Sequence, residues 1–76
     1  MPRIPEIRPK QIQKLLLKLG FIARQGKGSH VVFKHSDGRR TVIAFHNRPI
    51  SIGVLISVLR QIKFSVNDFL KLIKSL

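Results

Sequence analysis

Three histidines, His30, His35 and His46, are the side chains of this sequence best suited to acid–base chemistry. An imidazole titrates near neutrality, so it can give or take a proton at physiological pH. Other catalytic groups are scarce, since the chain has no cysteine and its three acidic residues lie far apart in the sequence. These are Glu6, Asp37 and Asp68. Because two-metal sites and carboxylate dyads need several carboxylates at one point, we expect no metal site and no cofactor.

His30 is the most informative histidine because it follows a Gly-x-Gly-Ser turn, Gly26 to Ser29, at the start of a predicted strand. An exposed imidazole that can reach a phosphate can act as a general acid or base. His30 can equally be an ordinary solvated histidine of a strand. Ser29 either donates to a phosphate oxygen or caps the turn. Gly28 either lets a phosphate approach the backbone or only supplies a turn conformation.

The other candidate binding residues are cations and a second histidine. His46 ends a predicted strand on the same face as His30. There it is either a second acid–base group or phosphate contact, or a hydrogen-bond partner of the following loop. Lys27, Lys34 and Arg40 are the cations that we expect to bind a phosphate backbone and to stabilise negative charge that develops near His30.

The predicted hairpin between the second and third strands carries three more residues of interest. His35 is expected to point away from the face of His30, in a structural or solvated role. Arg39 and Arg40 at the end of the hairpin either bind a phosphate or form a solvated edge. The preceding Gly26-Lys27-Gly28 loop lacks the Gly-Lys-Ser/Thr sequence of a P-loop, so nucleotide hydrolysis is not indicated.

The charge of the chain indicates the class of its partner. Fifteen lysines and arginines against three acids give 76 residues a formal net charge of +12. Such a charge destabilises a compact domain unless a polyanion binds it, so nucleic acid or an acidic protein is expected. With 43% hydrophobic residues the chain is too apolar for a disordered basic tail, and its length suits a single domain, 1–76. The longest apolar stretch, Ile50 to Leu59, is interrupted by polar residues and far too short to span a membrane. We therefore expect a cytoplasmic protein without membrane association.

The first half of the sequence predicts an extended arm, a helix and three strands. Residues 1–8 contain two prolines and form the arm, while Pro9 suits the first position of a helix, where its missing N–H costs nothing. Apolar residues recur at helical spacing up to Leu19, and Gly20 is expected to end the helix in the left-handed conformation. Strands are expected at residues 21–25, 29–35 and 41–46.

The loop between the second and third predicted strands decides which side chains share a face. A three-residue loop, 36–38, with Gly38 left-handed pairs Val31 with Ile43 and Phe33 with Thr41, and brings Phe45 to the same apolar face. The opposite, mixed and basic face then carries His30, Val32, Lys34, Arg40, Val42, Ala44 and His46. A two-residue turn would separate Phe33 from Phe45, since a slip by one residue turns every side chain over. We therefore favour the three-residue loop.

Two helices are expected in the last third of the chain. Ser51 can cap a helix whose apolar residues, from Val54 to Ile62, recur at helical spacing, but the many β-branched residues of this segment would also suit a strand. Ser65 with Asp68 has the form of a capping box. The element order is thus α-β-β-β-α with a final short helix. It predicts an α+β fold in which helices cover the apolar face of a three-stranded antiparallel sheet and leave the basic face open.

The order of short motifs resembles that of a known family, the HicA (YcfA-like) toxins of bacterial and archaeal toxin–antitoxin pairs. The resemblance spans the chain from Pro9 onward. The motifs that carry it are Gly20-Phe21, Gly28-Ser29-His30-Val31-Val32-Phe33, Asp37-Gly38-Arg39, His46-Asn47, Gly53-Val54-Leu55, Leu59-Arg60-Gln61 and Ser65-x-x-Asp68-Phe69.

The resemblance implies a fold like that of a double-stranded-RNA-binding domain and a small, metal-independent endoribonuclease that cleaves mRNA. It also implies inhibition by a HicB-like antitoxin and places the catalytic histidine of the family at His30. No role is carried over for His46. Two alternatives on the same fold are a non-catalytic module that binds structured RNA by shape and phosphate contacts, and a basic, ribosome-associated protein. Cleavage of RNA separates the first reading from the other two.

Overall fold

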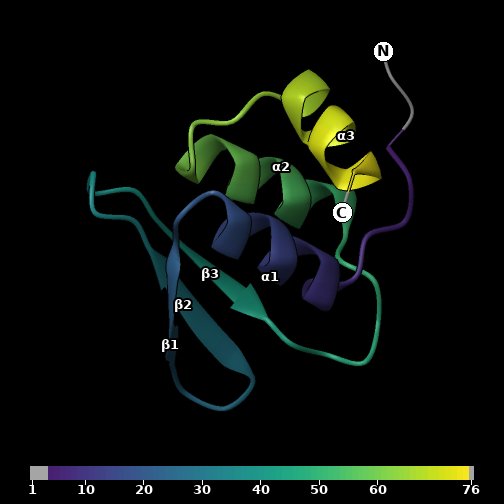
Figure 1. The fold of residues 1–76 in the computed structure, drawn as a ribbon. Coiled ribbons are helices and arrows are strands. Elements are labelled where there is room, and N and C mark those ends of the chain that lie inside the picture. Colours follow the sequence, from purple (N-terminus) through teal and green to yellow (C-terminus); the bar gives the residue numbers. More distant parts are fainter. Residues whose placement is uncertain (1–3, 76) are drawn as a thin grey trace.

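The computed structural model describes residues 4–75, and its elements follow the predicted order (Figure 1). They are α1 (Pro9–Lys18), β1 (Ile22–Gln25), β2 (His30–Lys34), β3 (Arg40–Ala44), α2 (Ile52–Gln61) and α3 (Val66–Lys74). The fold is α+β with one three-stranded antiparallel sheet, as expected. Of the predicted arm, residues 1–3 lie outside the described part, and residues 4–8 form neither helix nor strand.

The sheet has the strand order β1-β2-β3 and the predicted register. Val31 pairs with Ile43 and Phe33 with Thr41, which confirms the three-residue loop. Gly38 adopts a φ of 99°, a left-handed value that glycine tolerates without strain. The third strand starts one residue earlier than predicted and ends two residues earlier. The last bond of that ladder runs from the Phe45 N–H to the Ser29 carbonyl, at 2.8 Å.

The core lies between one face of the sheet and the helices. Phe33 and Ile43 are buried on that face, against Leu16 of α1 and Leu59 of α2. Helices α1 and α2 pack on the sheet, and α3 packs on those two helices (Figure 1). Phe69 of α3 is buried in the core. None of the helices within residues 4–75 covers the opposite face of the sheet, which leaves its side chains accessible to a partner.

Local signals set the helix ends. Pro9 is the first residue of α1, and Gly20 ends the turn after it with a φ of 95°. The Phe21 N–H then reaches the Leu16 carbonyl at 2.9 Å, as in a Schellman motif. Ser51 and Ser65 accept hydrogen bonds from the N–H groups three residues later and cap α2 and α3. Of the capping box predicted at α3, only this bond to the Ser65 hydroxyl is formed within residues 4–75. Among residues 4–75, no helix is both long and apolar enough to cross a membrane.

Candidate nucleic-acid interface

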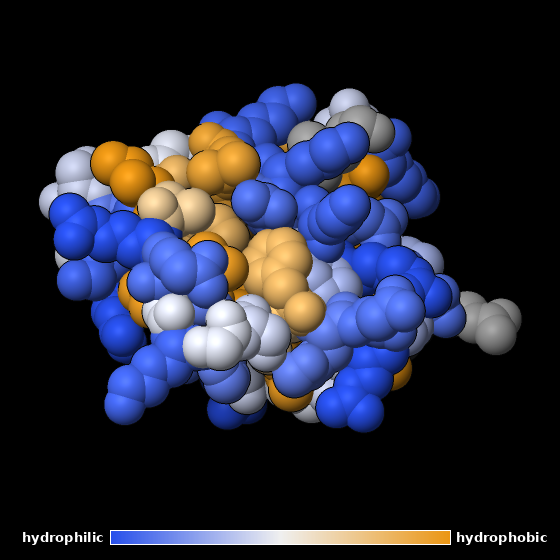
Figure 2. Space-filling view, turned by 90° about the horizontal axis from the view of Figure 1, so that it is seen from below, coloured by the Kyte–Doolittle hydropathy of each residue, from blue (hydrophilic) through white to orange (hydrophobic). Residues whose placement is uncertain are grey.

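The open face of the sheet carries three of the residues that the sequence singled out, His30, Lys34 and Arg40. Side chains alternate along a strand, and because Val31 and Phe33 face the helices, His30, Val32 and Lys34 face away from them. His30 and Lys34 are exposed. Seen from below Figure 1, the side on which the β1–β2 loop lies, hydrophilic side chains surround a band of apolar ones (Figure 2). This side of the molecule therefore offers a partner both polar and apolar contacts.

The ring of His30 is oriented by the loop that precedes it. Its Nδ1 lies 3.2 Å from the Lys27 carbonyl oxygen, and its backbone N–H donates to the same oxygen at 3.0 Å. A carbonyl oxygen only accepts hydrogen bonds, so Nδ1 is the nitrogen that carries the proton. In the neutral ring, Nε2 then keeps a free lone pair. The arrangement leaves Nε2 able to accept a proton from a bound molecule.

Glycines shape this loop for two different reasons. A Cβ atom on Gly26 would lie 2.9 Å from the His30 carbonyl oxygen, so only glycine lets the end of β1 approach the start of β2 this closely. Gly28 adopts a φ of 59° with open space around it, and the Gln25 side-chain amide donates to its carbonyl at 3.1 Å. Gly28 therefore supplies the left-handed conformation of the turn, and the open space around it also leaves room for a ligand.

The structure separates two of the expected cations from His30. Lys34 and Arg40 are register partners at the far end of the strands. His30 and Lys34 are four residue steps apart along β2, about 13 Å at 3.3 Å per residue. These two cations can therefore bind a polyanion together, at a different phosphate from the one that His30 can reach. Lys27 and Ser29, within the β1–β2 loop, are much closer to the histidine along the chain.

Arg24 is a cation of this face that our reading of the sequence missed. It pairs with Val32, so it is a diagonal neighbour of His30 across the first two strands, a spacing of about 7–8 Å that a long side chain can bridge. The signal was present in the alternation of β1, in which Ile22 and Arg24 point away from the face of Phe21. Arg24 lies closer to His30 than Lys34 does.

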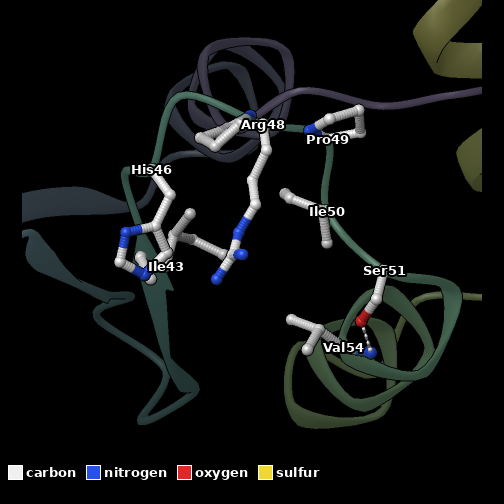
Figure 3. A pocket seen from close by; sticks show the side chains of 9 residues that line it. Ile43, His46, Arg48, Pro49, Ile50, Ser51 and Val54 are labelled. Atoms are coloured by element: carbon white, nitrogen blue, oxygen red, sulfur yellow. Dashed lines mark hydrogen bonds between the residues drawn. The ribbon is translucent and has the colours of Figure 1, made fainter.

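His46 lies outside the sheet, because β3 ends at Ala44. It is exposed and borders a pocket of about 360 Å³ at the outer edge of β3. In Figure 3 the side chain of Arg48 extends into this pocket between His46 on one side and Val54 of α2 on the other. The sequence predicted Val54 only as an apolar residue of a helix and gave no function to Arg48. No pattern within a single element brings the two together.

His35 and Arg39 make contacts within the protein and have structural roles. The sequence had left open whether His35 is structural or solvated, and whether Arg39 binds a phosphate or forms a solvated edge. Nε2 of His35 donates to the Leu19 carbonyl at 3.2 Å, and its ring packs edge-on against Phe21. The Arg39 guanidinium donates to the Ile62 carbonyl at 2.6 Å and to Asp37 Oδ2 at 2.8 Å. Arg39 is thus committed to contacts within the protein, whereas its neighbour Arg40 is exposed.

Asp37 organises the loop between β2 and β3. The backbone N–H of Arg39, which donates to Oδ1 at 3.0 Å, and the Arg39 guanidinium lower the pKa of Asp37 below its ordinary value of 3.8. A lowered pKa in the folded state means that the carboxylate stabilises the loop at pH values above 3.8 and that this contribution is lost as the pH falls through the lowered value. At neutral pH the loop keeps its full set of bonds.

The fold and the site together define a small, strongly basic α+β domain with a histidine on the open face of its sheet. Within residues 4–75, no three His, Asp or Glu side chains gather closely enough to hold a metal ion. The sequence model of the family described as the HicA toxin of bacterial toxin-antitoxin systems matches residues 9–64. The chain therefore belongs to the HicA toxin family, as the motifs indicated. No curated protein matches the chain.

Membership of this family makes the protein a toxin and implies an antitoxin as its partner. The matched region includes β2 with His30, the β2–β3 hairpin and α2, but it ends before α3 begins at Val66.

Proposed function

We propose that this toxin is an endoribonuclease that cleaves mRNA, with His30 as the general base. The observation that carries the proposal is the hydrogen bond from Nδ1 to the Lys27 carbonyl, because it leaves Nε2 as a proton acceptor on an exposed, basic face. Nε2 takes the proton of a ribose 2′-hydroxyl, and that oxygen attacks the adjacent phosphorus. The bond from phosphorus to the 5′-oxygen breaks, and the leaving oxygen takes up a proton from water, which gives a 2′,3′-cyclic phosphate and a 5′-hydroxyl end.

The surrounding residues bind the RNA backbone in two places. Lys27, with Ser29 and the exposed backbone of Gly28, contacts the phosphate that reacts and stabilises charge that develops on it. Lys34 and Arg40, at the far end of the strands, hold a phosphate further along the RNA. His46 borders the neighbouring pocket and contacts the nucleotide there. The chain supplies only three acidic residues, so the reaction proceeds without a metal ion or another cofactor.

The antitoxin that this proposal requires is a HicB-like acidic protein. Its negative surface covers the basic face and competes with RNA for His30. Toxin and antitoxin meet in the cytoplasm, where mRNA is available, and residues 1–76 act as one toxin domain.

The test is cleavage by the purified His30→Ala variant. We expect a loss of at least about a hundredfold, as is usual when a general base is removed, with the circular dichroism spectrum and RNA binding retained. Activity of the parent protein should persist in excess EDTA. An RNA with a single 2′-deoxynucleotide at the cleavage site should resist cleavage there, because the attacking oxygen is missing.

Three results would contradict the proposal. Undiminished cleavage by His30→Ala would exclude the histidine. Activity lost in EDTA and restored by magnesium or manganese would show a metal-dependent reaction. RNA binding by the parent protein without any cleavage would favour the non-catalytic RNA-binding module or the ribosome-associated protein.

A further inference from the structure

We propose that the pocket at the outer edge of β3 binds one unstacked nucleobase of the RNA, next to the phosphate that reacts at His30. This inference rests on the proposed function and adds a subsite to it. The pocket lies between the end of β3, the loop 45–51 and the first turn of α2 (Figure 3). Three observations carry the inference: the lining of the pocket, its distance from His30 and the backbone groups that border it.

The lining combines apolar walls with planar polar side chains. Ile43, Ile50 and Val54 form apolar walls, and the volume of about 360 Å³ lies within the range of sites that hold small ligands. His46 and Arg48 stand beside them (Figure 3). Proteins hold the splayed bases of single-stranded RNA by stacking them on histidine rings and guanidinium planes. A nucleobase, which has flat apolar faces and a polar edge, matches this combination.

The register of the sheet places the pocket beside His30. Ala44, which lines the pocket, is the register partner of His30. The Phe45 N–H donates to the Ser29 carbonyl next to this pair. Because hydrogen-bonded and non-hydrogen-bonded pairs alternate along an antiparallel ladder, His30 and Ala44 form a non-hydrogen-bonded pair, in which Cα atoms are about 4.5 Å apart. The side chains of such a pair stand close together on one face. RNA with a phosphate at His30 therefore has a neighbouring base at the mouth of the pocket.

The edge of β3 supplies polar groups that can read the base. In the same ladder, the N–H and C=O groups of Ala44 point away from β2, toward the outer edge of the sheet. One donor and one acceptor side by side match the polar edge of a base. Val54, half exposed on α2, borders the other side of the pocket. We therefore expect the pocket to set a base preference at one position next to the cleaved bond.

The loop that forms the pocket is held in place from outside. The Ile50 N–H donates to the Ile7 carbonyl at 2.7 Å, and Ile7 is buried. The Ser51 hydroxyl accepts from the Val54 N–H at 3.3 Å, which anchors the loop to α2. A pocket whose walls are tied to the arm on one side and to a helix on the other does not have to be ordered by its ligand. Such preorganisation favours discrimination between bases.

The test uses two variants of the pocket and one matched control. Val54→Phe fills the pocket, and Arg48→Lys keeps the charge but removes the guanidinium plane. Ile52→Phe adds a similar ring in the same helical turn, at an exposed residue that does not line the pocket. The probes are short single-stranded oligoribonucleotides that carry a 2′-deoxynucleotide at the cleavage site, with an abasic nucleotide placed at each position in turn. Binding is measured for every pair of protein and probe, and cut positions are mapped on a randomised RNA.

We expect one abasic position, next to the cleavage site, to weaken binding by the parent protein about tenfold, the scale of a lost base-stacking contact. Val54→Phe and Arg48→Lys should weaken binding of the intact probe by a similar factor and respond no further to the abasic nucleotide. Both should also lose the base preference at that position in the cut-site map. Ile52→Phe should behave as the parent protein does.

Several outcomes would overturn the inference. Equal binding of intact and abasic probes by the parent protein would show that no base is held. If Val54→Phe and Ile52→Phe bind the probes equally well, the pocket holds no base. If Val54→Phe weakens only the binding of the antitoxin, the pocket is a contact with that protein. The proposed nuclease activity can fail independently of the subsite. If binding depends on one base and on Val54 and Arg48, but no RNA is cleaved, the subsite is supported and the nuclease activity is refuted.

Discussion

The position and orientation of the His30 side chain depend on the four residues before it. The Lys27 carbonyl orients the imidazole, and Gly26 allows the strand that carries His30 to begin where it does. These two backbone contacts involve no RNA atom, yet both would affect the proposed reaction. Misplacement of a catalytic group by about 1 Å can cost roughly a hundredfold in rate. Backbone contacts of His30 are therefore as important as its position on the open face.

Gly26→Ala tests this dependence. The new methyl group would meet the His30 carbonyl oxygen at 2.9 Å, too close for any carbon, so the backbone must shift. We expect cleavage of RNA to fall about ten- to a hundredfold, while binding of a non-cleavable RNA stays within about twofold because the cations are unchanged.

Gly53→Ala is the matched control, since no atom beyond its chain neighbours and the nearby backbone of its own helix lies within 4 Å of the added group. It should raise the free energy of unfolding by up to about 1 kcal/mol, because alanine favours a helix, and leave cleavage unchanged. Equal cleavage rates for the two variants would show that the contact at Gly26 does not position His30.

At the scale of elements, one side chain joins the sheet to the helices. Arg39 follows the β2–β3 loop, bonds to Asp37 within that loop and reaches the Ile62 carbonyl at the end of α2. Its guanidinium also lies 5.1 Å from the centroid of the Phe21 ring, at the start of β1. The hairpin that carries Lys34 and Arg40 is thus fastened to the helical layer at its tip.

Replacement of Arg39 by Met should therefore weaken the fold rather than the binding of RNA. We expect the free energy of unfolding to fall by about 1–2 kcal/mol, the scale of a hydrogen bond to a charged group that is partly exposed, as measured by urea denaturation.

Arg40→Met removes the same charge from an exposed neighbour that makes no side-chain hydrogen bond within residues 4–75. It should change stability by no more than about 0.5 kcal/mol and weaken the binding of RNA instead. If the two variants lose equal stability, the contact with Ile62 is not a structural link.

At the scale of the whole molecule, the charge of +12 governs how partners meet it. A polyanion is attracted from a distance, and complementary charge mainly raises the rate of association. The same positive field would attract both RNA and an acidic antitoxin, so the antitoxin would inhibit the toxin by competing with RNA for the basic face. A standard interface of about 1,200–2,000 Å² in total would cover the open sheet face of a domain this small.

The charge-reversed double variant Lys34→Glu, Arg40→Glu tests this view of the antitoxin. We expect association with the antitoxin to slow by at least about tenfold, with a smaller effect on dissociation, and added salt to slow association of the parent protein in the same way. Rates are measured by surface plasmon resonance after circular dichroism confirms the fold.

Lys14→Glu, Lys18→Glu is the control with the same change in charge, placed on exposed positions of α1. It should slow association less than the variant on the sheet does. Association as fast as that of the parent protein in the sheet variant, or a bound antitoxin that leaves His30 open to solvent, would show that the inhibitor binds elsewhere.

The sequence by itself determined the elements and the two faces of the sheet, because those features depend on signals within a few residues. Proline, glycine and serine mark the helix ends at Pro9, Gly20 and Ser51. Loop length and alternation set the register that puts His30 on the open face. The strand ends were predicted less accurately. The last ladder bond is at Phe45, so His46, which was predicted to end the strand, lies in a loop.

Only the tertiary structure decided which distant residues meet. Arg39 resembles a phosphate-binding residue in the sequence, but it serves the fold because packing brings Ile62 within reach of its guanidinium. The pocket beside His30 joins Ala44, Arg48 and Val54 from a strand, a loop and a helix. Periodicity within one element tells which side chains face the core. It contains no information on how the end of one element sits against the start of another, because that placement follows from close packing of the whole core.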